Sequence, residues 1–366
     1  MTCTLPRKKL ISYCLLLALP AAGIALFYCL RHDQAVMDYW VSNIMAPFEQ
    51  FMGRMWALFP FSVAEAGIAL TIAAVVLWLL RAVVLLCLQR QVRAFLRRSL
   101  ALLSVALWVW CLLCWMWNAG YYATSFTEKS GLSSQGHTPE ALLYTTAWFA
   151  QNTAELSVQI PRDEEGHFDV PVEECFVRGV GIYDNLVAEF PFLSIPSVRV
   201  KPLFFSRLQS VLGFTGVYLP FSGEANVNVD APACLIPATI AHEMSHQRMV
   251  ASELEANFVG IAACLSCDDV VFRYSGYLQG LISLSSALNK VSPQAWDAVM
   301  ATYFTPEMVT DWNDNYYYWQ ALQSPLEDGA EQTYDAFLKG NGQSLGVASY
   351  GACVDLLITY YLPKIT

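Results

Sequence analysis

Two histidines and a glutamate stand together in the pentapeptide His242-Glu243-Met244-Ser245-His246. On a helix, residues i and i+4 point to the same side, so His242 and His246 can share one zinc ion while Glu243 lies beside the metal as a candidate general base. The apolar run 235–241 before the motif predicts a buried helix, in which imidazoles without a metal or hydrogen-bond partner would be costly. The pattern therefore predicts a zinc hydrolase site.

A catalytic zinc ion needs three protein ligands and one open position, so a third ligand must come from elsewhere in the chain. No third histidine lies nearby, and the choices are the carboxylates of Glu253 and Glu255. The spacing Glu253-x-x-x-Asn257 favours Glu253, because Asn257 one turn later would hold the distal nitrogen of a metal-bound histidine, most simply His242. Glu255 stays as the alternative.

The chain between the motif and Glu253 must turn sharply. If one helix continued past His246, Glu253 would lie about 10 Å farther along its axis, too far away to share a metal ion. We therefore expect the helix to break between Met249 and Ser252, with the third ligand on a second helix.

These roles predict peptide hydrolysis by a zinc-activated water. Glu243 would take a proton from the water and return it to the leaving amine. The carbonyl oxygen needs one further donor, for which Tyr350 is the candidate, although a core tyrosine is the simpler interpretation of that residue. Glu224 is expected on a strand that borders the cleft, where it would either bind a substrate amine or serve a structural purpose at a turn.

Composition indicates a membrane protein, because the 366-residue chain is 55% hydrophobic and only 14% charged. Three apolar stretches in the first third are long enough to span a bilayer, at about residues 10–30, 62–88 and 99–117. The first stretch is longer than the apolar core of a typical signal peptide and has no evident cleavage site, which favours an uncleaved helix.

Charge asymmetry predicts the orientation of the chain. Residues 1–119 carry 10 Lys and Arg against 4 Asp and Glu, whereas residues 120–366 carry 11 against 27. The positive-inside rule places the basic N-terminus and the basic loop around residues 90–98 in the cytoplasm, and residues 120–366 outside the cytoplasmic membrane. The acidic balance argues against nucleic acid as a partner. The expected partners are the lipid bilayer and a peptide or protein substrate.

The sequence thus predicts a membrane domain, residues 1–119, and an outer domain, residues 120–366. In the outer domain helical spacing dominates, but segments 197–204 and 216–229 alternate as strands do, with a short helix at 206–212 between them. Ser292-Pro293 and Thr305-Pro306 mark helix starts. The expected fold is mainly α with a small antiparallel β-sheet, in which three N-terminal transmembrane helices precede a zincin-like α+β extracytoplasmic domain.

Longer motifs resemble those of a known family. The bacterial membrane family called domain of unknown function 3810 is similar to this chain over residues 216–228, 242–248 and 255–258, over 337–343 and 349–351, and in the arrangement of its N-terminal spans. The HExxH and ExxAN motifs are similar to those of gluzincin zinc peptidases, although the resemblance implies no substrate. The family usually has glycine where this chain has Met249.

The sequence as a whole predicts a membrane-anchored, zinc-dependent metallopeptidase. A non-catalytic zinc-binding membrane sensor or scaffold is the alternative. Glu243 discriminates between the two, because a purely structural zinc site has no use for a base beside the metal.

Overall fold

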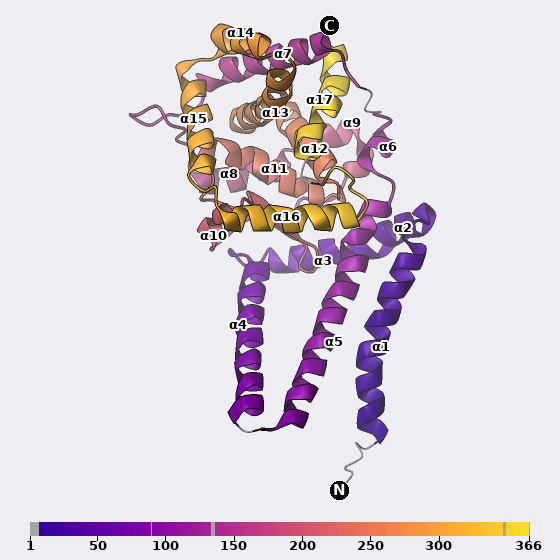
Figure 1. Cartoon of the computed structure of the whole chain (residues 1–366). Helices are drawn as coiled ribbons and strands as arrows, with labels where there is room; N and C mark the ends of the chain where they lie inside the picture. The colour runs from indigo at the N-terminus through magenta and orange to yellow at the C-terminus, as the bar shows by residue number, and fades with distance from the viewer. Residues whose placement is uncertain (1–6, 89, 133–135, 347–348, 366) are drawn as a thin grey trace. The chain divides into compact units, whose positions relative to one another are not determined.

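The computed structural model describes residues 7–88, 90–132, 136–346 and 349–365, and most of them are helical (Figure 1). The chain divides into two compact units. Unit 1 holds Met1–Met45 and Val63–Ala123, and unit 2 holds Ala46–Ser62 and Thr124–Thr366. The predicted division into a membrane domain, residues 1–119, and an outer domain, residues 120–366, stays a prediction.

Unit 1 is a set of apolar helices: α1 (Arg7–Leu30), α2 (Gln34–Trp40), α4 (Val63–Val83), α5 (Val92–Met116), the π-helices η1 (Val41–Met45) and η2 (Val84–Leu88), and the 3-10 helix η3 (Asn118–Tyr122). Helix α1 packs on α5, where the Trp115 indole donates a 3.0 Å hydrogen bond to the Gly23 carbonyl. Gly23 permits this close approach, because a Cβ there would lie 2.6 Å from the Cys111 sulfur.

Two helices of unit 1, rather than the three predicted, are long and apolar enough to cross a membrane among the described residues, namely Val63–Leu88 and Val92–Met116. In the first predicted span, the apolar helix found among the residues with described side chains is Leu15–Leu30, which is part of α1. The side chains of the two long helices are mostly exposed. This exposed apolar surface indicates association with a membrane.

Unit 2 is mainly helical. Its helices are α3 (Ala46–Trp56), α6 (Phe126–Ser130), α7 (Pro139–Ser157), α8 (Val172–Arg178), α9 (Asp184–Glu189), α10 (Ser206–Val211), α11 (Ile236–His246), α12 (Glu253–Ser266), α13 (Val270–Val291), α14 (Pro293–Tyr303), α15 (Pro306–Gln320), α16 (Pro325–Gly340) and α17 (Ser349–Ile365), with 3-10 turns at Gly179–Gly181, Pro191–Leu193 and Ala233–Leu235. The predicted starts of α14 and α15 are confirmed, because Ser292 and Thr305 accept hydrogen bonds from backbone N–H groups three residues on and proline follows each of them.

The core of unit 2 lies around α13, which packs against α7, α11, α12 and α17 (Figure 1). Phe149, Phe258, Phe272 and Leu281, from three of these helices, are fully buried. Burial of each such side chain contributes about 1.5–3 kcal/mol. The packing gives α11 and α12, which carry the predicted site, a rigid support.

A small sheet adjoins the helices in the order β1-β3-β2, with β1 at Lys201–Pro202, β2 at Gly216–Leu219 and β3 at Glu224–Val227. β2 pairs antiparallel with β3, but β1 pairs parallel with β3, so the sheet is mixed and the antiparallel prediction was wrong. The reason is the crossover through α10, found where the short helix was predicted, which carries the chain from one side of β3 to the other. β2 is therefore an edge strand.

Helix α3 is built into unit 2 by close contacts with the sheet. Tyr218 on β2 donates to Glu49 Oε2 over 2.7 Å, and Lys201 on β1 donates to the Trp56 carbonyl over 2.7 Å. Gly223, in the turn between β2 and β3, has a φ of 62°, and a Cβ there would lie 2.0 Å from the Glu49 carbonyl oxygen. This turn thus requires glycine both for its backbone conformation and for its contact with α3.

Candidate metal centre

Helix α11 carries both histidines of the HExxH motif. It begins at Ile236 with Pro237 in its first turn, where a missing backbone N–H costs nothing, and most of its residues are buried. His242 and His246 lie one turn apart, with ring centroids separated by 4.9 Å and ring planes at 88°. The predicted arrangement of the two imidazoles on one helix face is confirmed.

The chain turns sharply after α11, as the metal-site prediction required. Helix α11 ends at His246 and α12 begins at Glu253. Between them Met249 has a φ of 61°, in the left-handed region, and the Val250 N–H donates back to the Ser245 carbonyl over 3.2 Å. Methionine thus makes the turn without a glycine, at a cost of about 1–2 kcal/mol.

Helix α12 brings Glu253 back to the two histidines. Glu253 Oε2 lies 3.2 Å from His242 Nε2, and Glu253 Oε1 lies 3.8 Å from His246 Nε2. Within the described part of the chain, these three residues form the one group that could hold a metal ion, with one ligand atom from each lying within 4.8 Å of the others. The three residues could therefore hold a metal ion, and which ion they would bind stays a prediction.

The close packing of α12 on α11 depends on Gly260. This glycine lies seven residues after Glu253 and so on the same face of α12. A Cβ at Gly260 would lie 2.8 Å from the backbone nitrogen of His242. Because backbone cannot swing aside as a side chain can, a larger residue would push the helices apart and move Glu253 away from the histidines.

A backbone carbonyl fixes the orientation of His246. The Val250 carbonyl oxygen lies 2.7 Å from Nδ1, so the proton resides on Nδ1, and Nε2, which faces Glu253, keeps its lone pair. Burial lowers the pKa of His246 to about 4, which keeps the imidazole neutral at physiological pH. Neutral imidazole with an accepting Nε2 is the form that binds zinc.

Glu253 and His242 shift each other's pKa in opposite directions. Burial acts to raise the pKa of Glu253, but the two histidines and a tyrosine hydroxyl outweigh it and lower that pKa to about 2. Burial likewise acts to lower the pKa of His242, yet Glu253, with smaller effects of Glu243 and Asn257, raises it overall. Asn257 thus lies beside His242, where it was predicted, and its part in holding a metal-bound histidine stays a prediction.

Glu243 is buried against the edge strand of the sheet. It is 3% exposed, and a Cβ on Gly216 of β2 would lie 2.4 Å from its Oε1. Its Oε2 is buried and has no hydrogen-bond partner among the residues that the structure describes. Burial raises the pKa of Glu243 to about 8, with partial compensation from His242, so the carboxyl group carries a proton at neutral pH in the metal-free protein.

A tyrosine that the sequence analysis did not identify reaches the cluster. Tyr334 on α16 donates a 2.5 Å hydrogen bond to Glu253 Oε1, and its ring lies beside those of Phe214 and Phe337. Ser324 caps α16 and Pro325 follows it, the same signal that marked α14 and α15, so the helix itself could have been found. No local sequence pattern shows which face of α16 meets the cluster.

Two other predicted residues have partners outside the cluster, and the side chain of a third is not described. Glu255 accepts hydrogen bonds from the backbone N–H groups of Phe126 and Thr127 at the start of α6, because two residues of helix turn it away from the face that carries Glu253. Glu224 is 1% exposed and pairs with Lys201 over 2.6 Å, and its part at a substrate cleft stays a prediction. The side chain of Tyr350, in α17, lies outside the described residues.

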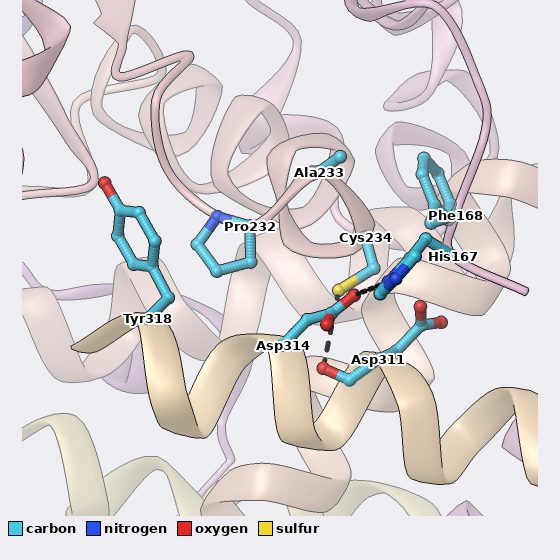
Figure 2. A pocket seen from close by; sticks show the side chains of 8 residues that line it. All are labelled: His167, Phe168, Pro232, Ala233, Cys234, Asp311, Asp314 and Tyr318. Atoms are coloured by element: carbon cyan, nitrogen blue, oxygen red, sulfur yellow. Dashed lines mark hydrogen bonds and ion pairs between the residues drawn. The ribbon is translucent and has the colours of Figure 1, made fainter. Parts of the chain in front are cut away.

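A separate pocket of about 310 Å³ lies beside α15, and none of its lining residues belongs to the metal cluster. Figure 2 shows His167 and Asp314 pointing toward each other in this pocket, and their Nδ1 and Oδ2 atoms are 2.7 Å apart. The buried Asp311 is paired with Arg162, also over 2.7 Å. These acidic groups are thus paired within the protein, and we assign the pocket no ligand.

Comparison with known proteins gives a family. No curated protein and no solved structure matches this chain. The family model described as "Protein of unknown function (DUF3810)" matches residues 40–358, a range that includes α3, the metal cluster and α16. With a match over most of its length, the chain belongs to the family of unknown function DUF3810.

Proposed function

We propose that this protein is a membrane-anchored zinc metallopeptidase that hydrolyses peptide bonds with Glu243 as general base. The observation that carries the proposal is the environment of Glu243, a buried carboxyl group with one oxygen that no described residue partners, next to a His-His-Glu cluster that could hold a metal ion. An unsatisfied buried polar group costs about 1–3 kcal/mol. A site that held zinc only for stability would gain nothing in return for that cost.

The donor set favours zinc over harder cations. Two imidazole nitrogens and one carboxylate oxygen are typical of catalytic zinc sites, which keep a fourth position open. Zinc bound there would supply Lewis acidity to a water molecule and to the substrate carbonyl group. With the HExxH helix α11 packed beside an edge strand, unit 2 would have the zincin-like arrangement that the motif predicts.

The protein groups would then bind the substrate and move the proton. The pKa of Glu243, about 8 in the metal-free protein, falls when a cation lies nearby, because the cation favours the ionised carboxylate. Glu243 can then accept a proton from water and donate it to the leaving amine. The Tyr334 hydroxyl, held at Glu253, is our candidate donor to the carbonyl oxygen as negative charge develops there.

The edge strand beside the base suits an extended peptide. β2 pairs with β3 on one side only, and Gly216 at its start lies against Glu243. A peptide that adds to β2 through backbone hydrogen bonds would place one of its own peptide bonds next to Glu243. Glycine at position 216 keeps a side chain out of the space that this peptide bond needs.

We infer that α4 with η2, and α5, cross the cytoplasmic membrane, with α1 as a third, N-terminal span. The length, apolar composition and exposed side chains of Val63–Leu88 and Val92–Met116 support this inference, and the assignment of α1 rests on the apolar run 10–30 in the sequence. The cluster Arg90, Arg93, Arg97 and Arg98 between the two long apolar segments favours the cytoplasmic side for that connection, which would place unit 2 outside.

Metal content and peptidase activity of the full-length protein in detergent test the proposal. Wild type should bind about one zinc per chain, and His246→Ala should bind none. Glu243→Gln should retain zinc and hydrolyse a peptide library about 10²–10⁴-fold more slowly, because it removes only the proton transfer. His167→Ala, an exposed histidine outside the cluster, is the matched control and should resemble wild type.

Each outcome separates the hypotheses. Folded wild type without bound zinc would overturn the metal centre, and full activity of Glu243→Gln would overturn the role of the base. Zinc binding without hydrolysis in wild type would favour the alternative of a non-catalytic zinc-binding sensor or scaffold.

A further inference from the structure

The segment 46–62, which links the first two predicted spans, exposes large apolar side chains although it belongs to unit 2. Phe51 is 64% exposed, Leu58 83% and Phe61 53%. Its other face is docked firmly, through Glu49 to Tyr218 and through the Trp56 carbonyl to Lys201. The exposed side chains are therefore held in place by the fold.

A second exposed apolar group lies on the neighbouring segment of unit 2. Lys201, which reaches the end of α3, precedes Phe204, the most exposed large apolar side chain in the described part of the chain at 85%. Phe205 and Leu208 on the following turn and α10 are also exposed. We call these six side chains the apolar surface: Phe51, Leu58, Phe61, Phe204, Phe205 and Leu208.

The charges around this surface differ from those of the rest of unit 2. Residues 190–223 contain Arg199, Lys201 and Arg207 and no Asp or Glu, although residues 120–366 as a whole carry 27 acidic against 11 basic residues. Arg199 and Arg207 are exposed, and so is Arg54 on α3. Aromatic and aliphatic side chains bordered by arginines are the chemistry that binds the surface of an anionic bilayer.

Chain continuity also points to a bilayer. Phe61 lies two residues before Val63, where the 26-residue apolar helix Val63–Leu88 begins. A helix of that length extends about 39 Å and thus exceeds the roughly 30 Å hydrocarbon thickness of a bilayer. If α4 spans a bilayer, as the proposed function holds, the end of the apolar surface at Phe61 must lie in its headgroup region.

We propose that the apolar surface inserts into the headgroup region of an anionic bilayer and that the metal centre cleaves membrane-proximal polypeptide segments. β2 connects the metal centre with the apolar surface. Its start at Gly216 lies against Glu243, and its end leads into the turn that packs on α3. Three residue steps of a strand cover about 10 Å. A peptide paired with β2 would therefore be cleaved within a few residues of the bilayer surface. This substrate class rests on the proposed peptidase function, whereas the membrane contact does not.

The membrane contact is tested in the full-length protein, reconstituted in nanodiscs of phosphatidylcholine and phosphatidylglycerol. A nitrobenzoxadiazole probe is attached at Phe204→Cys, with Val158→Cys, 66% exposed elsewhere on unit 2, as the matched control. Both variants carry serine at Cys3, Cys14, Cys29 and Cys87, and the remaining cysteines are buried. We expect blue-shifted emission and quenching by doxyl-labelled lipid at position 204 and neither at position 158.

An aqueous spectrum at position 204 would overturn the proposal, and so would a blue shift without lipid quenching, which would show that protein covers the surface. The substrate class is tested with peptides tethered to the same nanodiscs at increasing distances from the lipid anchor. Phe204→Asp, at an exposed position that tolerates a charge, should slow cleavage of the near-membrane peptide several-fold and leave a free soluble peptide unaffected. Equal slowing of both peptides would refute the substrate class, and absence of all hydrolysis in wild type would refute the proposed function while leaving the probe result intact.

Discussion

Replacement of Glu243 by glutamine should change how the stability of the metal-free protein depends on pH. Burial raises the pKa of Glu243 from 4.5 to about 8, so the folded state binds this proton more tightly than the unfolded state does. The stabilisation from that proton is complete below pH 4.5 and is lost as the pH rises from 4.5 through 8. Glutamine has nearly the same shape and carries no titrating proton, so this loss should disappear in Glu243→Gln.

The pKa shift sets the magnitude. Between pH 4.5 and pH 7 wild type should lose about 3 kcal/mol through this group, at 1.36 kcal/mol for each pH unit. For a unit of this size that corresponds to a change of about 6–12 °C in melting temperature. The glutamine amide has its own cost, because Oε2 of Glu243 has no partner among the described residues, but this cost does not vary with pH.

The assay is thermal unfolding of full-length protein in detergent with a chelator, followed by tryptophan fluorescence from pH 5 to pH 8. The difference in melting temperature, Glu243→Gln minus wild type, should rise steadily across this range. Glu331→Gln, on the exposed face of α16, should show a constant difference. Parallel curves for Glu243→Gln and wild type would refute the reasoning, because they would mean that Glu243 is ionised or hydrated in the metal-free protein.

Three further predictions concern the support of the site, each measured as free energy of unfolding of the full-length protein. Gly260→Ala should cost about 1–3 kcal/mol and abolish zinc binding, because the added Cβ meets the backbone of α11. The control Gly329→Ala has open space around it and should stabilise α16 by about 0.5–1 kcal/mol. Equal effects of the two substitutions would contradict the argument that α12 needs glycine to approach α11. Met249→Gly should be about 1 kcal/mol more stable than Met249→Ala, because only glycine accepts a φ of 61° without strain, and the reverse order would show that the turn relaxes. Lys201→Met should cost about 3–5 kcal/mol because it removes the cation that pairs with the buried Glu224 carboxylate, and the double variant with Glu224→Leu should recover much of that loss. No recovery would assign the effect to packing alone.

The metal cluster could be predicted from sequence because its parts are local. His242, Glu243 and His246 lie within one helical turn, and Glu253 follows after a connection short enough that geometry required a break in the helix. Met249 provides that break without the glycine that usually signals it. Helix periodicity shows that Glu253 and Glu255 face different sides of one helix, and the spacing of Glu253 to Asn257 favoured Glu253 as the third ligand.

Residues that reach the site from distant segments could not be predicted in this way. Tyr334 is 81 residues from its partner Glu253, and Glu49 is 169 residues from Tyr218. Such contacts are set by how elements pack, which hydrophobic periodicity does not encode. The parallel strand β1 has only two residues, too few for alternation to reveal its pairing, so the sheet was expected to be antiparallel.

The position of α3 in the chain, ahead of α4 and α5, has a consequence for the biosynthesis of the protein. The ribosome makes α3 before α4 and α5, yet the residues that hold it, Lys201 and Tyr218, are made only after both apolar helices. The carboxyl group of Glu49, which is buried in the folded protein, therefore meets its partner only after the second part of unit 1 and the sheet have been synthesised. If α4 and α5 cross a membrane, as we propose, a chain in which only one of them inserts would leave α3 on the opposite side from the sheet, and the contacts between α3 and the sheet could not form. On the proposed topology, the interleaved order of the two units thus makes assembly of unit 2 conditional on correct insertion of α4 and α5.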